Sequence, residues 1–181
     1  MRNVVDTARL ALRPFELQDS EELHEIFSDP QTHTIGDGPF TSLEQTHDWI
    51  DRRIEARRRS GLVWYAVRDR ATGLLLGNCG VFTGRTGPDD PEIGYEIRQS
   101  WQGQGLAGEA ARAVLDEALS SGIPRIWATI RPHNTASQRV ATRIGLQHHS
   151  VGADSKGRLL YLVSPRQSHH PGDNLSRISA G

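Results

Sequence analysis

The sequence contains very little cysteine and lysine. Cys79 is the only cysteine among 181 residues, so no internal disulfide can form, which suits a reducing compartment. Cys79 also lies inside an apolar stretch, where we interpret it as a small buried residue and not as a nucleophile. Lys156 is the only lysine, so a lysine Schiff base could use no other residue. These absences argue against covalent catalysis.

A charge excess and long apolar runs are also absent. The 21 Lys and Arg residues nearly balance 22 Asp and Glu residues, and this net charge of -1 lacks the basic excess typical of nucleic-acid binders. No apolar stretch approaches the ~20 residues of a membrane helix, and residues 1–6 do not resemble a signal peptide. The histidine pairs at 148–149 and 169–170 have no Cys, Asp or Glu at ligand spacing. We expect a cytoplasmic protein with no nucleic-acid, membrane or metal partner.

One stretch, residues 92–119, combines a strand, a glycine-broken turn and an amphipathic helix. Gly103, Gly105 and Gly108 allow a tight turn and a close approach of a ligand to the backbone. The turn leads directly into the helix, whose first N–H groups have no intrahelical partner and lie at the positive end of the helix dipole. Such an arrangement binds phosphate groups and predicts a nucleotide-like cofactor.

The patterning of the remaining chain predicts one α+β domain over residues 1–164. Strand 92–98 and strand 126–130 flank a helix and should be parallel neighbours, and 83–90 should be a loop. Residues 165–181 have the composition of a disordered tail. The other expected strands are 9–14, 62–68, 74–82, 146–151 and 159–163, and the other expected helices are 21–28, 41–59 and 134–144.

Several short motifs, in this order, resemble the GNAT superfamily of acyl-CoA-dependent N-acyltransferases, and within it the RimJ/RimL-like branch. The most specific is Gln102-x-x-Gly105-x-Ala107, which follows the strand segment Glu92-Ile-Gly-Tyr95. The similarity extends over residues 9–163 and includes Asn134-x-x-Ser137. It implies a three-layer α/β/α fold with four helices and a mixed, mostly antiparallel sheet of seven strands, splayed between strands four and five.

The resemblance also implies where acetyl-CoA binds. Backbone amides of the turn would hold the pyrophosphate, and the pantetheine arm would pair with residues 95–98 like an extra strand, with the amide near Ile97 polarising the thioester. Asn134 would contact the cofactor arm, although a helix N-cap is an equal alternative. The implied cofactor residues are Tyr95, Ile97, Arg98, Gln102, Gly103, Gln104, Gly105, Leu106, Ala107, Gly108, Asn134 and Ser137.

Direct attack of an amine on a thioester requires a proton acceptor for the ammonium and a proton donor for the departing thiolate. The resemblance places Ser137 near the sulfur as the general acid or thiolate stabiliser; the alternative is an ordinary polar residue on the first turn of a helix. Glu92 and Glu96 lie on one face of their strand, so either could be the base. Glu96 stands where this branch often has an aromatic residue. Tyr95 points to the opposite face, which favours a place in the core.

The expected function is therefore transfer of an acetyl group from acetyl-CoA to a primary amine, on a protein N-terminus or a small molecule, by a monomer or homodimer. Two alternatives remain. A GNAT-like protein could bind acyl-CoA as a sensor without catalysis. The match of Gly103-x-Gly105-x-x-Gly108 to the dinucleotide fingerprint allows an NAD enzyme, but residues 125–133 contain no acidic residue where that fold needs one.

Overall fold

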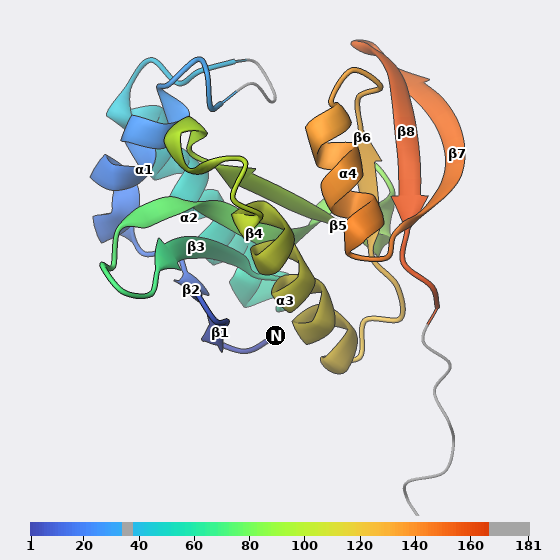
Figure 1. Ribbon diagram of the computed structural model, residues 1–181, viewed down its shortest axis with the longest axis horizontal. Helices are drawn as coiled ribbons and strands as arrows, with labels where there is room; N and C mark the ends of the chain where they lie inside the picture. Colours follow the sequence, from blue (N-terminus) through green and yellow to red (C-terminus); the bar gives the residue numbers. More distant parts are fainter. Residues whose placement is uncertain (34–37, 167–181) are drawn as a thin grey trace, which may run out of the picture.

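The computed structural model describes residues 1–33 and 38–166. In this part of the chain, eight strands form a single sheet in the order β1-β2-β3-β4-β5-β6-β8-β7 (Figure 1). The strands are β1 (Val5–Asp6), β2 (Leu10–Pro14), β3 (Trp64–Asp69), β4 (Leu75–Gly84), β5 (Gly87–Ile97), β6 (Trp127–Ile130), β7 (Gln147–Asp154) and β8 (Gly157–Val163). The predicted tail from residue 167 onward and residues 34–37 lie outside the described residues.

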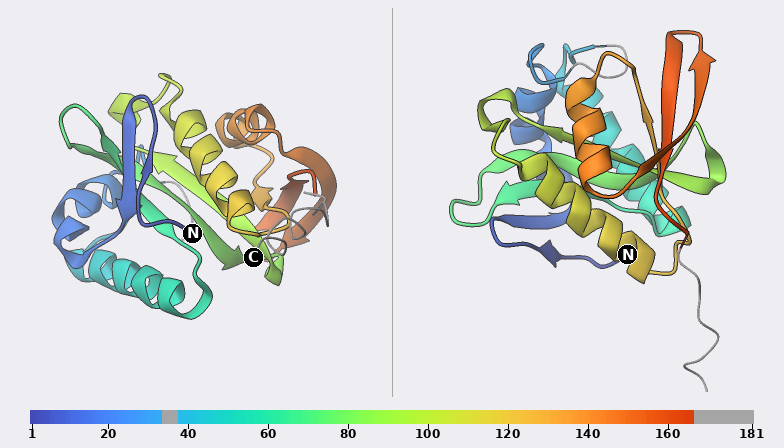
Figure 2. Two further views of the ribbon diagram at one scale, coloured as in Figure 1. Left: turned by 90° about the horizontal axis from the view of Figure 1, so that it is seen from below. Right: turned by 45° about the vertical axis from the view of Figure 1, so that its right-hand side comes forward.

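Four α-helices of the described chain cover the two faces of this sheet, giving the predicted three layers (Figure 2). Helices α1 (Ser20–Phe27) and α2 (Leu43–Ser60) bury a core that includes Phe27, Trp49 and Ile50. Helices α3 (Leu106–Ser120) and α4 (Thr135–Arg143) pack on the other face, over a larger core that contains Cys79. None of the helices in the described residues is long and apolar enough to span a membrane.

The sheet is mostly antiparallel and divides at its centre. β5 pairs with β4 at Gly87 and continuously from Glu92 to Ile97, whereas its parallel pairing with β6 consists of one residue pair, Glu92 with Trp127. The two strands diverge beyond that pair, as the views in Figures 1 and 2 show. The predicted parallel neighbours and the splay between the fourth and fifth expected strands are therefore confirmed.

Two expectations about strands are wrong in detail. The sheet has an eighth strand, β1, because two residues near the N-terminus pair with β2. Residues 83–90 do not form a separate loop, because β4 continues to Gly84 and β5 starts at Gly87, which has φ of 96°. The Thr86 N–H donates to the Glu92 carboxylate at 2.9 Å and closes this hairpin.

The expected helix ends are confirmed where the chain has capping residues. The Ser42 side chain and the Gln45 backbone and side chain form a capping box at the start of α2. The Asn134 side chain accepts from the Ser137 N–H at the start of α4. Gly145 follows α4 with φ of 93°, a left-handed conformation that favours glycine.

Candidate active site

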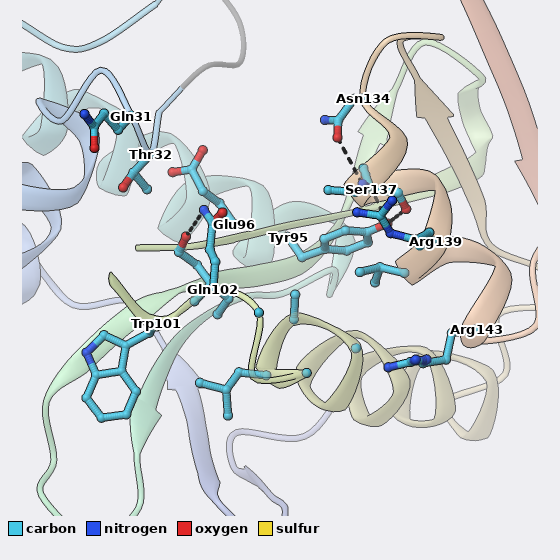
Figure 3. Close-up of a pocket in the computed structure, with 18 residues that line it drawn as sticks. Gln31, Thr32, Tyr95, Glu96, Trp101, Gln102, Asn134, Ser137, Arg139 and Arg143 are labelled. Atoms are coloured by element: carbon cyan, nitrogen blue, oxygen red, sulfur yellow. Dashed lines mark hydrogen bonds between the residues drawn. The ribbon is translucent and has the colours of Figure 1, made fainter. Parts of the chain in front are cut away.

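A pocket of about 410 Å³ lies where β5 and β6 diverge, between the start of α3 and one side of α4 (Figure 3). Its walls come from three parts of the chain that are distant in the sequence, within residues 31–32, 95–108 and 134–143. The lining residues are Gln31, Thr32, Tyr95, Glu96, Ile97, Trp101, Gln102, Gly103, Gly105, Leu106, Ala107, Gly108, Asn134, Ala136, Ser137, Arg139, Val140 and Arg143.

The glycine turn at the base of the pocket has room for a phosphate group. Gly103 and Gly105 have φ of 78° and 80°, so both need the left-handed conformation that side chains disfavour. A Cβ at Gly103 would meet nothing within 4 Å, and a Cβ at Gly108 would come no closer than 3.8 Å to Arg143. Since Gly105 caps α3 without a side-chain bond, the first amides of the helix are available to a ligand. The residues present therefore fit a pyrophosphate.

The end of β5 offers a backbone edge to the same pocket. Ile97 lies at this end, beyond the single pair that joins β5 to β6. The Gln102 side chain donates to the Ile97 carbonyl oxygen at 2.8 Å and fixes the chain as it leaves the strand (Figure 3). An extended ligand arm could pair with this edge as a strand does.

The α4 side of the pocket carries two linked hydroxyl groups. The Tyr95 hydroxyl donates to the Ser137 carbonyl oxygen at 2.8 Å, and the Ser137 hydroxyl donates to the Tyr95 oxygen at 3.1 Å. Burial raises the pKa of Tyr95 to about 12, so its phenol is protonated at neutral pH. Tyr95 is thus only partly a core residue: its ring packs against the core, but its hydroxyl reaches the pocket (Figure 3).

Glu96 faces the other side of the pocket, toward Thr32 (Figure 3). Its side chain is only 6% exposed, and its two oxygens lie 3.1 and 3.0 Å from Nδ1 of His33. Burial raises the pKa of Glu96, while the hydrogen bond and charge of His33 and the amide of Asn78 oppose that rise. A carboxylate with a raised pKa beside a cleft is a typical proton acceptor.

The structure does not bring every expected residue to this pocket. Glu92 is buried four residues earlier on β5, where it accepts from Thr86 and, at 2.6 Å, from the Thr129 hydroxyl. Arg98 pairs with Glu25 of α1 at 3.2 Å. Gln104 lines a neighbouring hollow instead, and its carbonyl oxygen accepts from Arg9. None of these three expected residues lines the pocket.

Sequence patterning missed other residues of the site. Trp101 lines the pocket, as do Arg139, Val140 and Arg143 of α4. The last three lie at helical spacing from Ala136, so they share one face of α4. That spacing is visible in the sequence and could have identified them once Ser137 was assigned to the site.

Comparison with known proteins decides the family. Residues 9–147 match the Acetyltransferase (GNAT) domain. The chain belongs to the GNAT acetyltransferase family. An uncharacterized N-acetyltransferase of Bacillus licheniformis, p20, is 29% identical over 173 residues, which cover 92% of this chain and 97% of the relative. A GNAT-family acetyltransferase structure from Bacillus anthracis is 26% identical with a TM-score of 0.76, and the match covers 88% and 96% of the two chains.

This GNAT acetyltransferase is an acyl-CoA-dependent N-acetyltransferase that uses acetyl-CoA. Its fold is similar to that of RimL, a ribosomal L7/L12 α-N-protein acetyltransferase solved in complex with coenzyme A, with a TM-score of 0.77, 20% identity and coverage of 88% and 96%. The sheet topology does not fit the NAD-enzyme alternative. A dinucleotide-binding sheet is mostly parallel and has its glycine turn in the first unit, whereas this turn follows five strands.

Proposed function

We propose that this acetyltransferase acetylates a primary amine that enters the pocket on the Glu96 side, and that Glu96 takes a proton from the acceptor's ammonium group. One observation carries the proposal: a buried carboxylate and the glycine turn at the head of α3 line the same pocket. The opposite wall holds the paired hydroxyls of Tyr95 and Ser137. The two walls of the pocket would thus provide a proton acceptor for the amine and a hydroxyl pair for the departing thiolate.

Acetyl-CoA supplies the activated acetyl group when it binds. Among the expected cofactor residues, Gly103, Gly105 and the first amides of α3 would hold its pyrophosphate, and Ile97 at the open edge of β5 would receive the extended arm. Asn134 lines the pocket and also caps α4 through the Ser137 N–H at 3.0 Å. Its two expected roles are therefore compatible, because the cap holds Ser137 in place.

The hydroxyl pair would serve the departing thiolate. Ser137 is the expected acid, and its hydroxyl proton, which the Tyr95 oxygen accepts here, would have to turn toward the sulfur to be transferred. Since the pKa of Tyr95 is raised to about 12 by burial, the phenol keeps its proton and could replace one that Ser137 gives up. The glutamate and the hydroxyl pair lie on opposite sides of β5, so proton acceptance and donation are spatially separated.

Two classes of amine acceptor, protein N-termini and small molecules, need separate tests. RimL acts on a protein N-terminus, and a ribosomal protein uS5-alanine N-acetyltransferase of Escherichia coli is 36% identical over 63 residues, or 34% of this chain. We infer that peptides with a free N-terminal alanine or serine are the first acceptors to test. Small amines, including spermidine and amino acids, form the second arm of the panel.

The decisive measurement is thiol release from acetyl-CoA over this panel, with each amine also supplied in its acetylated form as a control. Glu96→Gln should lower kcat by roughly 100-fold or more while the Kd for acetyl-CoA is nearly unchanged. Glu117→Gln is the matched control, because Glu117 is equally buried but lies on α3 and pairs with Arg2. Full turnover by Glu96→Gln would reject the assigned base. Silence over the whole panel, with tight binding of coenzyme A, would favour the sensor alternative.

A further inference from the structure

The imidazole of His33 is held in one orientation between aromatic rings. Its ring lies 4.5 Å from Phe27 and 5.1 Å, nearly at right angles, from Phe40, measured between ring centroids. His33 is 9% exposed. With the ring held in this way, its Nδ1 atom faces both carboxylate oxygens of Glu96, at 3.1 and 3.0 Å. An ionised carboxylate can only accept, so the Nδ1–H of His33 donates to it.

The backbone that carries His33 is fixed by a short turn after α1. The His33 N–H donates to the Asp29 carbonyl oxygen at 2.8 Å. The Thr32 hydroxyl donates to the Asp29 carboxylate at 2.6 Å and accepts from the Gln99 N–H at 2.9 Å. Gln99 lies two residues beyond β5, so this turn is tied to the end of the strand that carries Glu96. These hydrogen bonds therefore fix the backbone at His33 relative to the strand of Glu96, and so hold the two side chains in contact.

The other polar groups near Glu96 in the described part of the chain do not provide a charged hydrogen-bond donor to its carboxylate. Asn78 of β4 lies opposite Glu96 in the strand ladder and contributes an uncharged amide. Arg98, two residues further along, pairs with Glu25 of α1 at 3.2 Å. Among the described residues, His33 thus provides the donor that faces both oxygens. A buried carboxylate without that donor would bind its own proton more tightly and could accept no other.

We propose that His33 is a positioning residue for Glu96: its Nδ1–H holds the carboxylate in place and favours the ionised form that accepts a proton from the acceptor. The inference rests on the proposed role of Glu96. In the step itself, an N–H bond of the acceptor ammonium breaks and an O–H bond forms on Glu96. The electron pair of the broken bond remains on the nitrogen, which becomes the neutral nucleophile. Glu96 returns the proton to water when the acetylated product leaves.

Two substitutions separate this role from simple packing. His33→Phe keeps an aromatic ring between Phe27 and Phe40 but has no donor. His33→Asn loses the ring but places an amide N–H at the position of Nδ1. The titration of Glu96 can be followed without any acceptor from the side-chain carboxyl carbon-13 resonance, assigned by its loss in Glu96→Gln.

The expected result is a midpoint about one pH unit or more higher in His33→Phe, and a midpoint near that of the unchanged protein in His33→Asn. With the amine found active in the panel, the acidic limb of kcat/KM should move by the same amount. An unchanged midpoint in His33→Phe, or a larger shift in His33→Asn than in His33→Phe, overturns the inference. Failure of the proposed base is a separate result, because full turnover by Glu96→Gln rejects Glu96 whatever its titration shows.

Discussion

Tyr95 and Ser137 are joined by two hydrogen bonds that run in opposite directions, one from the phenol to the Ser137 carbonyl oxygen at 2.8 Å and one from the Ser137 hydroxyl to the phenol at 3.1 Å. The contact connects the C-terminal end of β5 to the first turn of α4. It therefore fixes the wall of the pocket and orients the serine in it.

Removal of the serine hydroxyl should affect chemistry more than binding. We expect Ser137→Ala to lower kcat about 100-fold, at the lower end of acid–base contributions, with the Kd for acetyl-CoA nearly unchanged by calorimetry. Tyr95→Phe breaks both hydrogen bonds and should also destabilise the fold by about 1 kcal/mol. Because the pKa of Tyr95 is raised to about 12, its ionisation should produce no loss of rate below about pH 11. Full turnover by Ser137→Ala would contradict the assignment.

The glycine turn should be the position most sensitive for cofactor binding. Gly105→Glu places a carboxylate in the space assigned to the pyrophosphate, so we expect at least about a 100-fold rise in the Kd for acetyl-CoA, or about 2.7 kcal/mol. The nearest side-chain atom to a Cβ at Gly105 is 3.8 Å away, so the folded protein can accommodate the side chain apart from the strain of a positive φ. Gly157→Glu is the matched control, with φ of 109° and no atom within 4 Å, in the β7–β8 hairpin. Equal binding by both variants would place the pyrophosphate elsewhere.

Two arginines of α4 should contribute charge to cofactor binding. Arg139 and Arg143 line the pocket, and neither forms an ion pair with a carboxylate among the described residues. Each change to Ala should raise the Kd for acetyl-CoA about tenfold, the loss of one charge-assisted contact with a phosphate group. The effect should shrink at high salt, because exposed charges are screened. Arg158→Ala, on the exposed side of β8, serves as the control and should leave the Kd unchanged.

The fold should lose stability in acid through Asp19. Burial alone would raise the pKa of Asp19, but hydrogen bonds from Arg13, the Glu16 backbone and Arg68 outweigh it and lower that pKa. Since the folded-state pKa is lower than the unfolded value of about 3.9, the stabilisation is complete above about pH 4 and is lost as the pH falls below it.

Asp19→Asn tests this directly. Its free energy of unfolding in denaturant should be roughly 3 kcal/mol lower at pH 7, because Arg13 and Arg68 both lose their pairs with the buried carboxylate. Arg68 keeps its second partner, Glu22. The difference from the unchanged protein should narrow toward pH 3. Asp51→Asn, an exposed position on α2, should show neither effect. A constant difference at all pH values would mean that the loss is one of packing.

Local chemistry explains which features could be predicted. The glycine turn and the Asn134 cap depend on residues a few positions apart, so the sequence was sufficient for them. β1 was missed because a strand of two residues is too short to show an alternation of apolar and polar side chains. The hairpin at residues 84–87 contains glycines that favour a loop, and its closing bond to Glu92 depends on tertiary folding.

The contacts in the active site were harder to predict from the sequence, because they depend on tertiary structure. Alternation along β5 correctly separated Tyr95 from Glu96, but it could not show that both faces of the strand border one pocket where β6 diverges. Nor does it separate Glu92 from Glu96, which share a face yet have unrelated partners. The contact between His33 and Glu96 joins positions 63 residues apart, across a turn that no short motif specifies.

The divergence of β5 and β6 leaves a seam in the middle of the sheet. One residue pair closes it at one end, so over the rest of its length the two halves have no ladder in common. A ligand arm that hydrogen-bonds along this seam would act as a missing strand, and its binding energy would add to the cohesion of the fold. Acetyl-CoA should therefore slow amide hydrogen exchange in β6 and β8 as well as at the residues it touches. In this protein, filling the site and completing the sheet would be the same event.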